Sequence, residues 1–318
     1  MSDGAPSPAR RGGLVSWLRH WRRTVKDRLP FVRRRVHARQ QRKYTQLAEA
    51  IGFGLRRANE ARLTVLKPAP SGHADELCLF LSFQPDAHLK AHVTAHVTAL
   101  LDRGVRVILV LHALLPPERL HLDPALLARL DGCYVRENAG YDFAGWAHVH
   151  QAIAPRLQVG RLFLVNDSIV GPLDGAAYDD VLDRIRASRA DVVGLTEAHF
   201  PRPHLHSFYL VFNARVLQAA LPRFFDEVLV FDDKGTVVDV YETLLTERLR
   251  RAGFRCEPVF APLAPDRQGA NDPYLLWGEL IDAGFPFVKA SIVRENPGHP
   301  TLRRTVPPAL LASPDLRP

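Results

Sequence analysis

Cysteine is scarce in this chain, and the few cysteines that it has are scattered. The 318 residues include three cysteines, Cys78, Cys133 and Cys256, and no two of them form a CxxC pair. An odd, dispersed set argues against a disulfide framework and fits a reducing compartment. Because all three lie in apolar or strand-like contexts, we expect them in the hydrophobic core.

Long apolar runs are also missing. No stretch approaches the roughly 18–20 consecutive apolar residues that a membrane-spanning helix needs, and arginines interrupt the N-terminus before a signal core can form. Apolar residues nevertheless make up 47% of the chain and charged residues 24%, which is an ordinary globular composition. We therefore expect a cytoplasmic protein with a sizeable buried core, built as one large α/β domain or two small ones.

Acidic residues are few in the first 43 positions, where 13 lysines and arginines face only Asp3 and Asp27. The whole chain has a net charge of +8, so the remaining residues together are mildly acidic. The excess of positive charge therefore belongs to the N-terminal segment. No RNP-type, zinc-finger or helix-turn-helix pattern accompanies it, and we expect no nucleic-acid partner.

The basic segment divides into two parts. Residues 1–13 are rich in Gly, Pro, Ser and Arg, which predicts a disordered basic tail. From Leu14 to Pro30, apolar residues including two tryptophans recur at three- and four-residue steps, with arginines mostly opposite them. This pattern predicts a basic amphipathic helical segment over 14–60, and residues 14–43 of it suit an anionic membrane surface. The chain would then be peripheral on the inner face of the cell membrane. The alternative is a helix that docks on the protein's own body.

From residue 77 onward, strand and helix patterns alternate. Short apolar runs predict strands at 77–83, 105–111, 132–136, 161–165, 191–195, 207–212 and 255–260. Helical patterns lie at 44–59, 88–103, from 141, at 215–229 and at 240–252. Such alternation predicts an α/β fold of Rossmann type, with a mostly parallel sheet and helices on both faces. We place this domain at 75–300 and a C-terminal tail at 301–318.

Two predicted strands end in polar residues, at the edge where open α/β sheets bind ligands. The first is followed by ENAGYDFAGW at 137–146, in which Gly140 permits a sharp turn or a close approach to a ligand. Asn138 and Asp142 offer polar groups at the start of the next helix. An N-cap and a turn would explain Asp142, but not the whole string with its aromatic pair.

At the second strand end, three oxygen-bearing side chains, Asn166, Asp167 and Ser168, directly follow an apolar strand. Carboxylate and amide oxygens suit a hard cation, Mg²⁺ or Mn²⁺, which would in turn hold a diphosphate. An Asx turn that closes the strand explains the same three residues. The composition alone leaves both interpretations open.

Four strings of the chain resemble the signature blocks of the rhamnan synthesis protein F family. They are ENAGYDFAGW, LVNDSIVGPL, HSFYLVFN and LLWGELIDAGFPFVKASIVRENP, and they follow the family's order over about residues 75–297. That family is associated with the assembly of rhamnose-containing polysaccharides and is classed with glycosyltransferases, and many members are longer. The resemblance implies a bacterial hexosyltransferase. Its donor would be a nucleotide sugar such as dTDP-rhamnose, and its acceptor a cell-surface glycan or a lipid-linked glycan of the lipopolysaccharide kind.

The order of the blocks is also similar to that of GT-A-type glycosyltransferases, in which an asparagine-glycine segment contacts the nucleotide and a DxD motif binds metal and diphosphate. This similarity implies a set of donor-binding residues: Glu137, Asn138, Gly140, Tyr141, Asp142, Asn166, Asp167 and Ser168. Asn166 and Ser168 stand where DxD has its outer carboxylates, so that only Asp167 is ionised. Mg²⁺ or Mn²⁺ held by Asp167 and Asn166 would therefore bind weakly or be dispensable.

The segment at 240–246, VYETLLT, resembles the acidic helix start that supplies the catalytic base in GT-A-type enzymes. Glu242, or failing that Asp239, would deprotonate the acceptor hydroxyl as it attacks the anomeric carbon. A single in-line displacement of this kind inverts the anomeric centre.

Several basic side chains complete the candidate residues. His199, Arg202 and His206 lie in or beside a loop before the HSFYLVF strand, where they would contact acceptor or diphosphate, unless the loop is an ordinary surface loop. Lys289 and Arg294 are plausible phosphate contacts that sequence does not distinguish from surface charges. The histidines at 88, 92 and 96 are four residues apart and lack acidic or cysteine partners, which favours a solvated helix face over a zinc site.

A non-catalytic subunit of a polysaccharide-assembly complex, with the same fold, is the main alternative. The loss of the outer DxD carboxylates favours it, whereas the presence of ENAGYD and Glu242 speaks for an enzyme.

Overall fold

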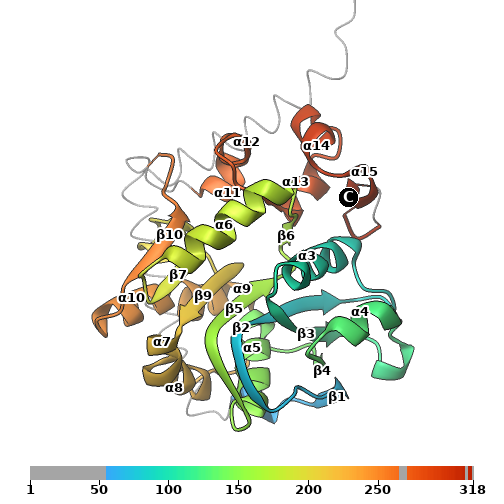
Figure 1. Cartoon of the computed structure of the whole chain (residues 1–318), viewed down its shortest axis with the longest axis vertical. Helices are drawn as coiled ribbons and strands as arrows, with labels where there is room; N and C mark the ends of the chain where they lie inside the picture. The colour runs from blue at the N-terminus through green and yellow to red at the C-terminus, as the bar shows by residue number, and fades with distance from the viewer. Residues whose placement is uncertain (1–54, 265–270, 312–313, 317–318) are drawn as a thin grey trace, which may run out of the picture.

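A nine-stranded, mostly parallel sheet forms the centre of the computed structural model, which describes residues 55–264, 271–311 and 314–316 (Figure 1). The predicted tail at 1–13 and the amphipathic segment up to residue 54 lie outside these ranges. Within the described ranges, no helix combines the length and the apolar character that crossing a bilayer requires.

The sheet has the strand order β1-β4-β3-β2-β5-β9-β7-β10, with β8 paired to β7. Strands β2 to β5 run parallel to one another, whereas β9 is antiparallel to both of its neighbours and β1 is antiparallel to β4. Strand β10 is parallel to β7. The bounds are β1 Leu63–Lys67, β2 Gly72–Gln84, β3 Arg106–Ala113, β4 Gly132–Glu137, β5 Leu157–Asn166, β7 Val192–Ala198, β8 His204–Leu205, β9 Tyr209–Asn213 and β10 Cys256–Phe260.

Helices cover both faces of the sheet, because successive side chains of each buried strand point to opposite faces. Leu79 of β2 packs with the layer that contains α5 (Tyr141–Ile153), α7 (Ala214–Ala219), α8 (Leu221–Asp226) and α10 (Thr243–Arg251). Phe80 packs with the opposite layer, formed by α3 (Ala91–Asp102), α4 (Pro124–Arg129) and α6 (Gly175–Ala187). In Figure 1, α6 crosses in front of the sheet and α5 lies behind it. The predicted α/β class is confirmed, and the three cysteines are free and buried, as expected.

The structure corrects several local predictions. The helix predicted at 215–229 is split into α7 and α8 at Ala220, since Pro222 in the first turn of α8 has no N–H with which to continue α7. Residues 58–60 form a 3₁₀ turn, η1 (Ala58–Glu60), where a longer helix was predicted. His92 and His96 are buried, so that the predicted solvated face is wrong.

The described residues after 287 form a smaller packed unit beside the main sheet. Strands β6 (Ile169–Val170) and β11 (Val288–Lys289) pair antiparallel, and three short helices follow along the chain: α13 (Ala290–Glu295), α14 (Pro300–Thr305) and α15 (Pro308–Leu311). Leu302, Val306 and Leu310 are buried in the same cluster as Val170. The expected C-terminal tail therefore includes packed helices, because these apolar side chains cover the β6–β11 pair.

Candidate functional site

A cavity of about 550 Å³ opens at the carboxyl ends of the parallel strands. The ends of β2, β3 and β5 contribute Phe83, His112 and Asn166 to its walls. Its other polar and charged lining residues are Asn138, Tyr141, Asp142, Asp167, Ser168, His204, His206, Ser207, Lys234, Asp239, Glu242, Thr243, Asn271, Tyr274 and Lys289. The two polar loops after β4 and β5 thus wall one pocket, at the edge where ligands of open α/β sheets bind.

The first loop turns through two consecutive residues with left-handed backbone. Gly140 has φ of 78° and Tyr141 has φ of 55°. A side chain at 140 would place its Cβ 2.6 Å from the Cβ of Ala144, so that glycine is required there. Left-handed geometry is costly for a tyrosine, and such strain concentrates at ligand-binding positions. The side chain of Tyr141 is 37% exposed and lines the pocket, and its hydroxyl donates to the carbonyl of Asp232 at 3.2 Å.

The two loops are joined by a hydrogen bond between side chains. Asn166 Nδ2 donates to Asp142 Oδ2 at 2.7 Å. Burial, together with the nearby charge of Asp167, raises the pKa of Asp142 to about 6. Asn166 Oδ1 accepts from the backbone N–H of Ser168 at 3.0 Å and from its hydroxyl at 2.6 Å, so the Asx turn considered from sequence is present.

Asp167 is held by groups of the neighbouring strand and helix. Its Oδ2 accepts from Ser82 Oγ at 2.9 Å, from the backbone N–H of Phe83 at 2.9 Å and from Lys90 Nζ at 2.7 Å. The Lys90 and Asp167 side chains are only 16% and 15% exposed. Lys90 therefore already compensates the charge of this carboxylate in a partly desolvated setting.

Hydrogen bonds within the protein occupy some of the side-chain oxygens that a divalent cation would use at the β5 end. Mg²⁺ and Mn²⁺ need several oxygen ligands, whereas Asn166 Oδ1 and Asp167 Oδ2 are both occupied by hydrogen-bond donors. Among the residues that the structure describes, no group of three or more His, Cys, Asp or Glu is arranged to hold a metal ion. One side-chain oxygen of Asn166 and one of Asp167 therefore already accept hydrogen bonds within the protein.

His92 connects Asp167 to the C-terminal turn η4 (Pro314–Leu316). Its Nε2 lies 3.0 Å from the carbonyl oxygen of Asp167, and its Nδ1 lies 2.7 Å from Asp315 Oδ2. Both partner atoms are hydrogen-bond acceptors, and the ring of His92 lies between them. His92 therefore connects the loop after β5 to the turn η4.

Glu242 and Asp239 enter the pocket from the opposite wall. Both lie on a π-helical turn, η3 (Val238–Glu242), which continues into α10, and such turns are frequent at functional sites. The backbone N–H of Ser207 donates to Glu242 Oε1 at 3.1 Å and orients the carboxylate. The main-chain oxygen of Asp239 accepts from the hydroxyl of Thr243 at 2.9 Å.

Lys289 approaches the β5 end from the small β6–β11 sheet. The register places it opposite Ile169, and its Nζ lies 3.0 Å from Ser168 Oγ. The ammonium also lies 4.4 Å from the ring centre of Phe208 and 5.4 Å from that of Tyr274. Burial lowers its pKa to about 8, against the opposing effect of Glu242.

His206 is a buried, uncharged member of the pocket wall. Its Nδ1 lies 2.9 Å from Thr196 Oγ1, and burial lowers its pKa to about 3. The ring stacks on Phe208 with centroids 5.5 Å apart. It can therefore offer a hydrogen bond or a flat surface to a ligand, but no positive charge.

Four predicted site residues lie outside the lining of the pocket: Gly140, which forms the turn described above, and Glu137, Arg202 and His199. Glu137 accepts from Arg56 Nη2 at 2.5 Å and from the backbone N–H of Arg62 at 3.1 Å, and these hydrogen bonds lower its pKa to about 2. Arg202 pairs with Glu247 at 2.5 Å. His199 is 3.0 Å from Glu197. Glu137, Arg202 and His199 were expected to contact a ligand, but in the structure each side chain faces a partner within the protein.

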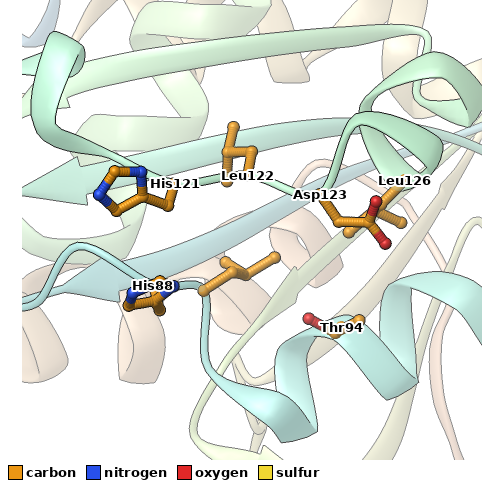
Figure 2. A pocket seen from close by; sticks show the side chains of 7 residues that line it. His88, Thr94, His121, Leu122, Asp123 and Leu126 are labelled. Carbon is orange, nitrogen blue, oxygen red and sulfur yellow. The ribbon is translucent and has the colours of Figure 1, made fainter.

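A second cavity of about 360 Å³ lies between the segments 88–94 and 121–126 (Figure 2). Figure 2 shows His88 and His121 one above the other, and their ring centroids are 5.0 Å apart. Its carboxylate, Asp123, caps α4 by accepting from the backbone N–H of Ala125 at 2.9 Å. Most of its other lining residues are leucines, and its single carboxylate is engaged in capping α4. This cavity is therefore the weaker candidate for a catalytic site.

Comparison with known proteins identifies the family. The model of the rhamnan synthesis protein F family matches residues 121–303. The chain is 26% identical over 234 residues to virulence protein VirA of Vibrio anguillarum, an alignment that covers 63% of this chain and 73% of that protein. It is also 27% identical over 197 residues to the uncharacterized protein y4gN of Sinorhizobium fredii, which covers 59% of this chain and 49% of y4gN. The matched family segment contains both polar loops, Glu242 and Lys289, and the chain belongs to the rhamnan synthesis protein F family.

Proposed function

We propose that this protein is a glycosyltransferase of polysaccharide biosynthesis that uses a nucleoside-diphosphate sugar. Family membership supports the role in polysaccharide biosynthesis. One observation carries the enzymatic part: the carboxylate of Glu242 lines the same cavity as the two loops that follow β4 and β5. Ligands bind at this edge of open α/β sheets, and a carboxylate that faces the bound ligand can act as a general base.

In this proposal the donor lies along the edge of the sheet. Asn138, Tyr141 and Asp142 contact the nucleoside, since the strained turn presents their polar and aromatic groups to the cavity. The diphosphate lies against Asn166, Asp167 and Ser168, which follow β5. His206 faces the sugar or the acceptor with a neutral imidazole.

The reaction is a single displacement. The acceptor hydroxyl oxygen attacks the anomeric carbon while the bond from that carbon to the diphosphate oxygen breaks, and the bonding electrons leave with the diphosphate. Glu242 receives the hydroxyl proton as the new bond forms, which a carboxylate can do because the proton becomes acidic in the transition state. The products are an inverted glycoside and a nucleoside diphosphate. Asp239, on the same π-helical turn, is the second candidate base.

A panel of nucleotide sugars tests the proposal. The full chain is incubated with dTDP-rhamnose and with UDP-, GDP- and dTDP-hexoses, each with a glycan or lipid-linked glycan acceptor, and release of nucleoside diphosphate is measured. We expect release from at least one donor, with dTDP-rhamnose as the first candidate by family resemblance. If the folded chain binds no nucleoside diphosphate and hydrolyses or transfers none of the donors, the proposal is wrong, and a non-catalytic subunit of an assembly complex becomes the better account.

We also propose that residues 14–43 attach the enzyme to the anionic inner face of the cell membrane, where lipid-linked acceptors are reached. The alternation of tryptophan and arginine in this segment supports the proposal. Sedimentation with vesicles of anionic lipid, compared with neutral vesicles, tests it. Full-length chain that stays in the supernatant with both would contradict it.

A further inference from the structure

The β5 end brings together an ion pair and a second buried lysine without a carboxylate partner. Lys90 and Asp167 neutralise each other at 2.7 Å. Lys289 is 7% exposed, and among the described residues no carboxylate oxygen lies within 4.0 Å of its Nζ. The carboxylates of Glu242, Asp142 and Asp167 act on this ammonium only at longer range. Held by one hydroxyl, it keeps two N–H donors for an anion that enters the site.

The side chain of Lys289 points into the cavity, so an anion that pairs with it would bind there. Its Nζ touches Ser168 Oγ, the last of the three residues that follow β5, and the lysine lines the cavity together with Asn166 and Asp167. The rings of Phe208 and Tyr274 flank the ammonium and keep water away from it. A phosphate group beside Ser168 would therefore meet a desolvated positive charge, where electrostatic attraction is strongest.

Lys234 adds a second cation on the opposite wall. It is the first residue of α9 (Lys234–Val237), it lines the same cavity, and it is exposed. An exposed lysine of this kind can turn toward a bound phosphate, whereas Lys289 is buried. Lys234 and Lys289 are thus the two lysines in the lining of this cavity, which also contains Asp142, Asp167, Asp239 and Glu242, and both can pair with a diphosphate.

We propose that Lys289, assisted by Lys234, neutralises the diphosphate of the donor and of the departing product in place of a divalent cation. This inference rests on the proposed function, and it identifies the side chain that pairs with the departing nucleoside diphosphate. As the bond between the anomeric carbon and the diphosphate oxygen breaks, that oxygen keeps the electron pair, and the ammonium of Lys289 pairs with the new charge. No proton needs to leave the lysine in this step.

Binding of UDP and dTDP measured by calorimetry tests the inference without reliance on turnover. Wild-type chain, K289M and the control R294M are each titrated in EDTA and again with Mn²⁺. Arg294, which the sequence left open as a phosphate contact, is exposed on α13 and does not line the cavity, so R294M removes a positive charge outside the pocket. We expect wild type and R294M to bind in EDTA, and K289M to bind at least about tenfold more weakly, as for loss of a charge-assisted hydrogen bond.

The thermal stability of the unliganded variants separates a lost ligand contact from a lost fold. Because K289M replaces a buried charge by an apolar side chain, we expect its melting temperature to equal or exceed that of wild type. Binding of a nucleoside diphosphate only when Mn²⁺ is present, or equal affinities of stable K289M and wild type, would overturn the role of Lys289 while leaving the transferase proposal intact. Absence of binding by wild type under both conditions would overturn both.

Discussion

The side-chain amide of Asn166 donates to the carboxylate of Asp142 across 2.7 Å, and this hydrogen bond joins the loop after β4 to the loop after β5. The two residues are separated by α5 and most of β5 in the chain. Their contact links the two loops directly, in addition to the hydrogen bonds that hold Asp167 to β2 and Lys90, and Tyr141 to Asp232. Alterations of either residue should therefore affect stability and ligand binding together.

Because the pKa of Asp142 is raised to about 6, we predict that D142N stabilises the fold, and that this stabilisation depends on pH. The carboxyl group of Asp142 holds its proton more tightly in the folded protein than in the unfolded chain, so ionisation of Asp142 destabilises the fold. This destabilisation is absent below about pH 4, grows as the pH rises to about 6, and is constant above that pH. Asparagine keeps an acceptor for Asn166 and carries no charge. We expect the free energy of unfolding of D142N to exceed that of wild type by roughly 2–3 kcal/mol at pH 7.5 and by little at pH 4.

Denaturant titrations at the two pH values measure this difference. D282N, an exposed aspartate of α12 (Trp277–Asp282), serves as the matched control and should change little at either pH. Equal stability of D142N and wild type at pH 7.5 would show that Asp142 is not under electrostatic stress.

Replacement of Glu242 tests the base. E242Q keeps the size of the side chain and an oxygen for the N–H of Ser207, but it cannot accept the acceptor's proton. We expect turnover to fall by about 10²-fold or more, as is typical of a lost general base, with affinity for nucleoside diphosphate changed less than about threefold. E279Q, an exposed glutamate on α12, is the control. Wild-type turnover in a folded E242Q would exclude Glu242 and direct attention to Asp239.

The turn at Gly140 predicts a steric effect. G140A would place a methyl group 2.6 Å from Ala144 Cβ and force alanine to φ near 78°. The left-handed backbone costs about 1 kcal/mol and the overpacking about 1–3 kcal/mol more. G284A has a similar φ of 88° with nothing within 4 Å, so it should show the backbone cost alone. If chemical denaturation finds the two variants equally stable, the close packing of the turn is not important.

Glu137 should be dispensable for donor binding. It was expected to contact the donor, but its carboxylate pairs with Arg56 outside the cavity, and the two side chains are 33% and 45% exposed. E137Q should leave the affinity for nucleoside diphosphate within about twofold and lower stability by less than about 1 kcal/mol, as for other exposed pairs. A tenfold loss of affinity in a stable E137Q would place this residue in the donor site after all.

Donor affinity should decline at alkaline pH. Lys289 has a pKa lowered to about 8 in the unliganded protein, and only its ammonium form attracts a diphosphate. Affinity should therefore be about twofold lower at pH 8 than at pH 7 and fall above pH 8 by at most about tenfold per pH unit, with a proton taken up on binding. Calorimetry from pH 7 to 9.5 in buffers of different ionisation enthalpy reports both effects. The decline should be absent in K289M, and its persistence there would assign it to another group.

Strand periodicity and local motifs predicted the fold class and the two loops, because both follow from short stretches of chain. The alternation of apolar runs indicated β2 to β5, and Gly140 indicated the sharp turn. The edge strand β1 was missed, since its half-buried residues carry only a weak pattern.

The remainder of the site depends on contacts between distant residues. Asp167 is paired with Lys90, 77 positions away, and Lys289 reaches Ser168 across 121 positions. No local pattern distinguishes such lysines from surface charges. The misplacement of Glu137 has the same origin, because its partner Arg56 comes from the segment before the sheet.

The contact of His92 with both Asp167 and Asp315 has a practical consequence for handling the protein. A chain shortened by its last few positions, or one whose terminal turn is pulled away by a fused tag, would leave this imidazole without its carboxylate. Weakened nucleotide binding in such a preparation would then report damage to the support behind the β5 loop, and it should be checked before any substitution in the cavity is interpreted.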